Sequence, residues 1–417
     1  MEAVREAIRQ LKENGYEEFV PGKKYQPGER FYYNNRGKSL IFGTMGTRPI
    51  EKGVKILAAH VDSPRLDLKP SPLFEEAELG YLRPHYYGGI KKYQWPTIPL
   101  ALHGDVYKKD GSVVTITIGE DENDPIFCVT DLLPHLSSKQ RTQTLAEAFK
   151  GESMNILIGS RQFKDEKASE KVKLNLMKIF NEKYGITERD FLGAELSVVP
   201  ALKARDLGLD RSMIGAYGHD DRVCSYTEMT AEIANTNPEW TSVVIFADKE
   251  EVGSDGNTGM HSRFLEYFLA DLAEPFGVPV RRVLSNSKCL SADVSAAFDP
   301  AFADAYVKNR TLPSSTTVYV LLNTQVQAVR AAPTTATLKF TSKVCAILDN
   351  ADVVWQFGEL GKVDQGGGGT VAKYIAELDV DTIDIGDSKF CACMLQWKSS
   401  PRLTCMKHIV VSMSSCC

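Results

Sequence analysis

The segment VKILAAH, residues 54–60, is a short apolar run that ends in a histidine. Apolar runs of this length without polar alternation are typical of strands buried on both faces of an α/β sheet. A second run of this kind, TSVVIFA at residues 241–247, stops just before the charged residues DKEE, 248–251. The sequence therefore predicts two buried strands, each followed by residues that can carry chemistry.

Helical periodicity follows these runs at residues 223–234, 264–272 and 370–378. Strands that alternate with helices indicate a mainly parallel sheet covered on both faces. The middle of the chain differs, because glycines and prolines punctuate β patterns there and a polar, charged stretch follows at 137–173. We therefore predict a catalytic α/β domain built from residues 1–85 and 206–417, interrupted by an inserted β-rich domain at 86–205.

Composition narrows the class of protein. The 417 residues are 43% hydrophobic and 25% charged with a net charge of −5, which is ordinary for a globular protein and weighs against nucleic acid as the main partner. No apolar run approaches the roughly 20 residues that span a bilayer, so we expect no membrane partner. The N-terminal stretch predicts an amphipathic helix and lacks the apolar core of a signal peptide. Scattered single cysteines fit a reducing compartment, so we expect a cytoplasmic protein.

Four segments hold clustered metal-type ligands: His60 with Asp62, Asp220 with Asp221, Glu250 with Glu251, and Asp293. Taken singly, they could be a structural histidine, a helix cap, exposed turn glutamates and a turn aspartate. Each segment follows a predicted strand or could follow one, and active sites in open α/β sheets lie at the carboxyl ends of strands. Together their imidazole and carboxylate groups suit zinc, manganese or cobalt.

These segments, in this order, resemble the aspartyl aminopeptidase family of zinc metallopeptidases, and most closely its bacterial branch. The matching strings are AAHVDSPRLDLKP, GHDDRVCSY, DKEEVGS, LSADVSAAFDP and GELGKVDQGGGGTVAKYIA. The resemblance covers most of residues 1–308 and 340–387. It implies an α/β/α sandwich catalytic domain of the zinc exopeptidase type, with the inserted β-rich domain serving oligomerisation, and a homo-oligomer that reaches a dodecamer.

The resemblance also implies residue roles around two divalent ions, zinc or alternatively cobalt or manganese. His60, Asp220, Glu251 and Asp293 would be metal ligands, with Asp220 bridging the two ions. Asp62 would orient His60, and Glu250 would be the general base that takes a proton from the attacking water.

The resemblance implies one further residue and a substrate. The string IPLALH, residues 98–103, matches one from which a histidine reaches a neighbouring subunit's site, so His103 is a substrate-binding candidate; the alternative is an ordinary strand histidine. The substrate would be a peptide with a free N-terminus, and the family name alone implies an acidic residue at that end. A related metal-dependent amidohydrolase or deacylase and an inactive oligomeric pseudoenzyme are the alternative functions.

The end of the chain departs from the family pattern, which closes on a histidine ligand in a HAP-like string followed by a glutamate. Residues 388–417 contain no Asp or Glu, although the chain has 54 of them. In another reading frame, codons compatible with the residues from Lys389 onward permit VLCMHAPMEVVSKAD, one ambiguous residue, and YEAY. The codon for the histidine of that string would span Cys393 and Met394.

The same frame change across residues 310–339 permits NAAFINYG, KYTGS and GKSGTND, and no acidic residue occurs between Asn309 and Asp349. We therefore predict reading-frame errors over about 309–339 and 388–417; the alternative is a genuinely divergent sequence. Without the last histidine one metal would lose an imidazole ligand and the folding energy linked to its binding. We expect the printed chain to be weakly active or inactive and the intended gene product to be active.

Overall fold

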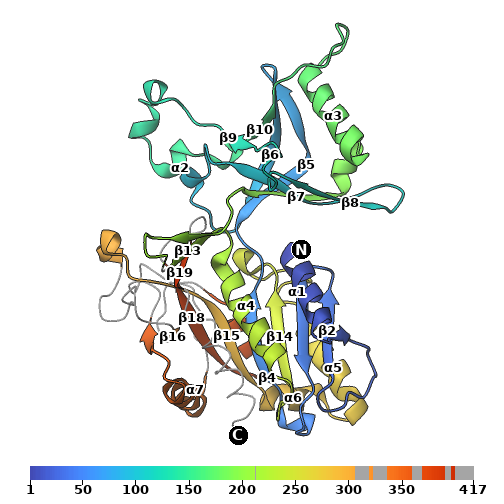
Figure 1. Cartoon of the computed structure of the whole chain (residues 1–417), viewed down its shortest axis with the longest axis vertical. Coiled ribbons are helices and arrows are strands. Elements are labelled where there is room, and N and C mark those ends of the chain that lie inside the picture. The colour runs from blue at the N-terminus through green and yellow to red at the C-terminus, as the bar shows by residue number, and fades with distance from the viewer. Residues whose placement is uncertain (212, 306–318, 323–335, 359–368, 390–395, 400–417) are drawn as a thin grey trace. The chain divides into compact units, whose positions relative to one another are not determined.

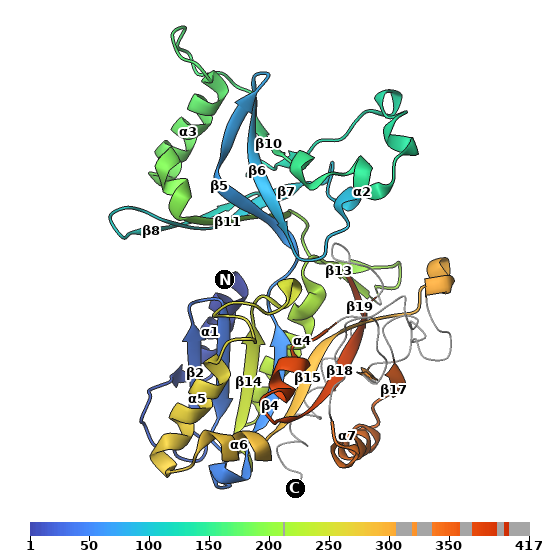
Figure 2. The same ribbon diagram turned by 180° about the vertical axis from the view of Figure 1, so that it is seen from behind.

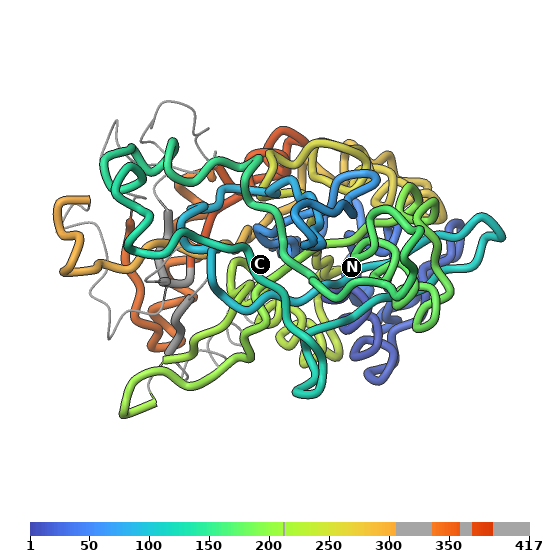
Figure 3. The backbone as a smooth tube through the Cα atoms, turned by 90° about the horizontal axis from the view of Figure 1, so that it is seen from above, coloured from blue at the N-terminus to red at the C-terminus, as the bar shows by residue number. Residues whose placement is uncertain are grey.

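The computed structural model describes residues 1–211, 213–305, 319–322, 336–358, 369–389 and 396–399, which can be followed by colour in Figure 3. The chain divides into two compact units. One unit comprises residues 1–63 and 205–417, and the other comprises residues 64–204. The first break therefore comes about 20 residues before the 85/86 boundary that we expected from the sequence.

A central sheet forms the first unit (Figure 1). Among the described residues it has nine strands, in the order β1-β2-β3-β14-β4-β15-β18-β16-β17. Strands β14, β4, β15 and β18 run parallel to one another, so their carboxyl ends share one edge. In sheet order the strands span Glu17–Glu18, Arg30–Asn35, Ser39–Thr44, Ser242–Ala247, Lys55–His60, Lys288–Ala296, Asp381–Lys389, Tyr319–Leu322 and Trp355–Gly358.

Helices cover both faces of this sheet, as the two opposite views in Figures 1 and 2 show. Side chains of strand β4 alternate between the two hydrophobic cores: Leu57 and Ala59 pack into one, and Ile56 and Ala58 into the other. The first core includes side chains of α1 (Glu2–Glu13), α4 (His219–Ala234) and α7 (Leu338–Asn350). The second includes those of α5 (Phe264–Ala273), α6 (Val280–Asn286) and α8 (Ala372–Ala376).

This arrangement confirms the predicted α/β/α sandwich. The apolar run at 54–60 forms β4 and the run at 241–247 forms β14, because both faces of each strand are covered. The helix predicted at 223–234 begins earlier, at His219, and the one predicted at 370–378 is shorter, Ala372–Ala376. A separate small sheet joins β12 (Arg205–Leu207), β13 (Met213–Ala216) and β19 (Gln396–Ser399).

The second unit is built on an antiparallel sheet of seven strands among the described residues, in the order β8-β7-β11-β5-β6-β10-β9. Its two longest strands, β5 (Arg65–Glu76) and β6 (Leu79–Tyr87), pair with each other. That pairing is why the unit begins at residue 64, before the expected boundary. The other elements are β7 (Leu100–Tyr107), β8 (Val113–Ile118), β9 (Cys128–Val129), α2 (Leu145–Ala148), β10 (Ile156–Gly159), α3 (Lys171–Tyr184) and β11 (Ala194–Pro200).

Most of the two segments with predicted frame errors, 309–339 and 388–417, lies outside the described residues. The described part of the chain contains no helix that is both long and apolar enough to cross a membrane.

Candidate metal centre and active site

His60 is the last residue of β4, and its side chain is buried. Its Nδ1 lies 3.0 Å from the carbonyl oxygen of Asp62 and 3.3 Å from an Asp62 carboxylate oxygen. A histidine whose Nδ1–H is donated to such oxygens has its tautomer and ring orientation fixed, which leaves Nε2 free to act as a ligand.

Carboxylates from three other elements surround the His60 Nε2 atom. In the described part of the chain, Oδ1 of Asp220 lies 3.0 Å away, Oδ1 of Asp293 3.7 Å away and Oε2 of Glu250 3.9 Å away. These residues come from the start of α4, from β15 and from a short 3-10 turn, η7 (Glu250–Val252), that follows β14. The parallel order β14-β4-β15 brings them to one edge of the sheet.

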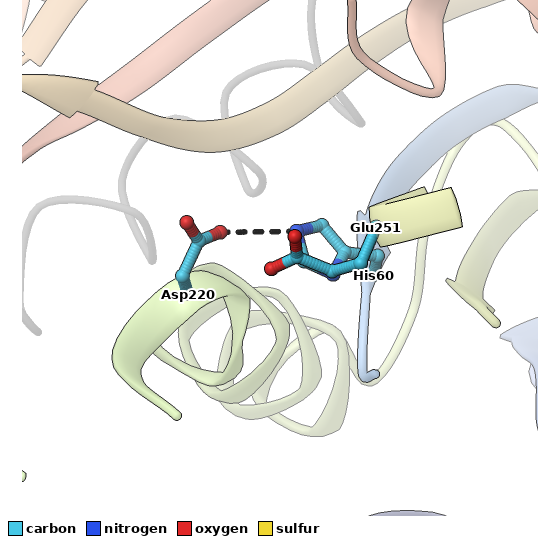
Figure 4. A group of neighbouring side chains, drawn as sticks. All are labelled: His60, Asp220 and Glu251. Carbon is cyan, nitrogen blue, oxygen red and sulfur yellow. Dashed lines mark hydrogen bonds and ion pairs between the residues drawn. The ribbon is translucent and has the colours of Figure 1, made fainter. Parts of the chain in front are cut away.

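Two sets of potential ligands share His60. One is His60, Asp220 and Glu251, drawn in Figure 4 with the Asp220 carboxylate facing the imidazole. The other is His60, Glu250 and Asp293. Within each set the ligand atoms all lie within 4.8 Å of one another. Such spacing allows three side chains to converge on a common cation.

The Asp62 carboxylate also holds the turn that carries Glu250 and Glu251. Its Oδ1 accepts a hydrogen bond from the backbone N–H of Glu250, and its Oδ2 accepts one from that of Glu251, both at 3.2 Å. One carboxylate therefore orients His60 and also anchors the turn that bears both glutamates.

Burial and crowding of charge shift the pKa values of this cluster. Burial by itself lowers the pKa of His60, but hydrogen bonds to Asp220, Asp293 and Asp62 outweigh it and hold that pKa well above its usual value. Burial, reinforced by the negative charge of Asp293, raises the pKa of Glu250 to about 8. Burial and the same Asp293 charge hold the pKa of the Asp221 carboxyl well above its ordinary value.

The donor set fits divalent metal ions. Buried carboxylates that converge without enough positive charge must bind protons or a cation, and the high pKa values express that need. Both carboxylate oxygens of Asp221 are buried without a hydrogen-bond partner among the described residues. Imidazole with carboxylate oxygens is the ligand chemistry of zinc, manganese and cobalt sites.

The structure brings together six of the seven residues to which the sequence analysis gave a role: His60, Asp62, Asp220, Glu250, Glu251 and Asp293. The seventh, His103, belongs to the second unit, where its Nε2 lies 3.0 Å from a carboxylate oxygen of Glu120. Helix capping does not account for the Asp220–Asp221 pair. The backbone of both residues is non-helical, so the regular part of α4 begins after them. The Asp221 carboxylate is fully buried and has no hydrogen-bond partner among the described residues, so it does not cap that helix.

Sequence reasoning missed Asp384 on β18, which pairs in register with Ser291 of β15. Its fully buried carboxylate accepts a hydrogen bond from the Thr370 hydroxyl at 2.9 Å, and burial raises its pKa to about 7. The only signal in the sequence was an aspartate within the apolar run VDTIDIG, residues 380–386.

The comparisons with known proteins identify the family. Residues 1–408 match the Peptidase M18 family, described as aminopeptidase I zinc metalloprotease. A probable M18 family aminopeptidase 1 of Clostridium acetobutylicum is 46% identical over 393 residues, which cover 92% of this chain and 84% of the relative.

Two solved structures extend the likeness to the fold. Aminopeptidase I from the same Clostridium species superposes with a TM-score of 0.92 at 43% identity, covering 99% of this chain and 91% of the other. The M18 aminopeptidase of Thermotoga maritima gives a TM-score of 0.91 at 39% identity, with the same coverage of both chains. The chain therefore belongs to the M18 family of aminopeptidase I zinc metalloproteases and is a peptidase of the aminopeptidase class.

Proposed function

We propose that this aminopeptidase removes single N-terminal residues from peptides with a two-metal site made by His60, Asp220, Glu251 and Asp293. The observation that carries the proposal is the convergence of these side chains at the carboxyl edge of β14, β4 and β15. Bound divalent ions, zinc or alternatively cobalt or manganese, would lower the pKa of a water and polarise the peptide carbonyl.

Glu250 is the general base in this scheme. It takes a proton from the attacking water and returns that proton to the leaving amine, so it must be ionised before the reaction starts. Its carboxylate faces His60 at 3.9 Å, and its backbone is held by Asp62. Asp62 orients the His60 ring and holds the η7 turn through the backbone N–H groups of Glu250 and Glu251.

The substrate is a peptide with a free α-amino group, which acidic side chains near the metal ligands can bind. The resemblance to aspartyl aminopeptidases suggests Asp or Glu as the released residue. Release of p-nitroaniline from Asp-, Glu- and Leu-p-nitroanilide therefore tests both the reaction and its preference, and N-acetylated Asp, Glu and Leu test the deacylase alternative.

The assay compares the printed chain with a version in which the HAPMEV reading frame is restored, each with added zinc, manganese or cobalt. We expect the restored version to be active and the printed chain to be weakly active or inactive, because the printed chain lacks the family's last histidine ligand. Glu250→Gln in the restored version should lose activity. Cleavage of N-acetylated substrates without cleavage of free-amine substrates would contradict the proposal.

We also propose a homo-oligomer, up to a dodecamer, in which the second unit supplies contacts. Several apolar side chains of that unit are exposed, namely Ile126, Leu132, Leu133, Leu136 and Leu145. A yeast aminopeptidase of the same fold, at 21% identity and a TM-score of 0.78, is a dodecamer. Mass photometry of the purified chain tests the assembly, and a monomer at micromolar concentration would refute it.

His103 is proposed to reach the site of a neighbouring subunit and bind substrate there. Mixing two inactive variants of the restored version, His103→Ala and Glu250→Gln, tests this directly. If His103 acts in trans, mixed oligomers regain activity, because some sites then combine an intact Glu250 with an intact neighbouring His103. If it acts within its own subunit, the mixture remains as inactive as its parts.

We propose that the enzyme is cytoplasmic, because the cysteines that the structure describes are free thiols. Cys128, Cys224, Cys289 and Cys345 are all free thiols in the described part of the chain. Free thiols are typical of a reducing compartment.

A further inference from the structure

The turn that carries Glu250 and Glu251 is closed by backbone hydrogen bonds. The N–H of Gly253 bonds to the carbonyl of Glu250 at 2.9 Å, and the N–H of Ser254 bonds to the carbonyl of Lys249 at 2.7 Å. Lys249, Gly253 and Ser254 all have positive φ, with values of 64°, 87° and 61°. Positive φ is unfavourable for Lys249 and Ser254, which are not glycines, so the turn needs outside contacts to keep one conformation.

Tyr374 supplies such a contact from a distant part of the chain. It lies on α8, and its hydroxyl donates a hydrogen bond of 3.1 Å to the carbonyl oxygen of Gly253, 121 residues away in sequence. Gly253 is also the residue whose N–H closes the turn on Glu250. The Tyr374 hydroxyl therefore holds the far end of the turn, while Asp62 holds its near end.

The ring of Tyr374 is itself held in place. The His261 imidazole meets it edge-on, with ring centroids 4.4 Å apart and an interplanar angle of 90°. Nδ1 of His261 lies 2.7 Å from a carboxylate oxygen of Asp255. Edge-to-face ring pairs of this kind prefer a defined geometry, so His261 limits the motion of the Tyr374 side chain.

Tyr374 also lies close enough to Glu250 to respond to its charge. Burial raises the pKa of the Tyr374 hydroxyl, and the carboxylates of Glu250, Asp255 and Glu377 raise it further. The hydroxyl consequently stays protonated at neutral pH and remains a donor.

We propose that Tyr374, backed by the His261–Asp255 pair, is a positioning residue that holds the η7 turn and thereby aims Glu250 at the water it deprotonates. The role rests on the function proposed above. Tyr374 acts through the Gly253 carbonyl, to which its hydroxyl donates.

Hydrogen exchange tests the proposal without any need for activity. Tyr374→Phe removes only the hydroxyl, and Tyr267→Phe, on the exposed side of α5, is the matched control. Amide exchange of the segment 249–256 should become about 3- to 10-fold faster in Tyr374→Phe, the range expected for one lost neutral hydrogen bond, and should not change in Tyr267→Phe. Unchanged exchange in Tyr374→Phe would overturn the proposal.

Kinetics on the restored version give the second readout. We expect Tyr374→Phe to lower kcat about 3- to 10-fold with KM, zinc content and thermal midpoint unchanged, since a purely structural defect would move the midpoint.

His261→Ala should give a smaller loss of kcat, and the double variant should lose no more than Tyr374→Phe alone, because both residues act on one turn. Faster exchange with unchanged kcat, or additive losses, would refute the positioning role. If the restored version without any substitution cleaves no free-amine substrate, the proposed function fails and hydrogen exchange alone decides the Tyr374 contact.

Discussion

Raising the pH should strengthen metal binding steeply. A metal ion needs the free lone pair of His60 Nε2, yet the surrounding carboxylates hold the pKa of His60 well above its usual value, so this nitrogen carries a proton at neutral pH. Glu250, with a pKa raised to about 8, also carries a proton there. Binding must therefore displace the His60 proton and, through the charge of the ion, the Glu250 proton.

The size of the effect follows from these two groups. An opposite charge nearby lowers a carboxyl pKa by about 1 to 3 units, so a doubly charged ion would bring the pKa of Glu250 from about 8 to between about 5 and 7. Between one and two protons should therefore leave per ion between pH 6 and 7.5. The association constant should then rise about 10- to 100-fold per pH unit, or about 1.4 to 2.7 kcal/mol, and fall by the same factor as the pH drops.

Isothermal titration calorimetry of zinc binding, in two buffers with different ionisation enthalpies, measures the released protons directly. Glu250→Gln is the matched control, since a neutral amide has no proton to lose and the slope should fall to about one, the His60 proton alone. A zinc affinity that does not change between pH 6 and 7.5, or an equal slope in Glu250→Gln, would refute the reasoning.

Three further predictions concern the first unit, residues 1–63 and 205–417. Asp62→Ala in the restored version should lower kcat about 10- to 100-fold and weaken zinc binding, because it releases both His60 and the glutamate turn; steady-state kinetics and chelator competition measure the two effects. Glu232 is fully buried, and burial raises its pKa from 4.5 to about 7. The folded state therefore loses about 3 kcal/mol of stability as the pH rises from 4.5 to 7. Urea unfolding at pH 5 and 8 should show this loss in the chain without substitutions and a smaller loss in Glu232→Gln. Glu228 is fully buried with no hydrogen-bond partner among the described residues, so Glu228→Met should raise stability by about 1–3 kcal/mol at pH 8, and a lower urea midpoint would contradict this account.

Local patterns in the sequence determined the elements of the fold. The runs at 54–60 and 241–247 could be recognised as buried strands because burial on both faces requires apolar side chains at consecutive positions. The types of residue in the site could also be read directly, since imidazole and carboxylate side chains at strand ends are suited to divalent metals. The boundary of the second unit could not be read from the sequence, because the pairing of β5 with β6 depends on contacts that no local pattern reports.

Only the tertiary structure decided how these residues meet. His60 and Asp220 are 160 positions apart in sequence but 3.0 Å apart in space, because α4 packs against β4. Glu250 and Asp293 join them because β14 and β15 flank β4 in an order that the chain does not follow. Asp221 reads as a helix cap in the sequence but is turned into the interior. Tyr374 carried no signal at all, because its role comes from one hydrogen bond to a carbonyl 121 residues away. Hydrophobic periodicity is a property of neighbouring residues, whereas the geometry of a site depends on strand order and on contacts between distant segments.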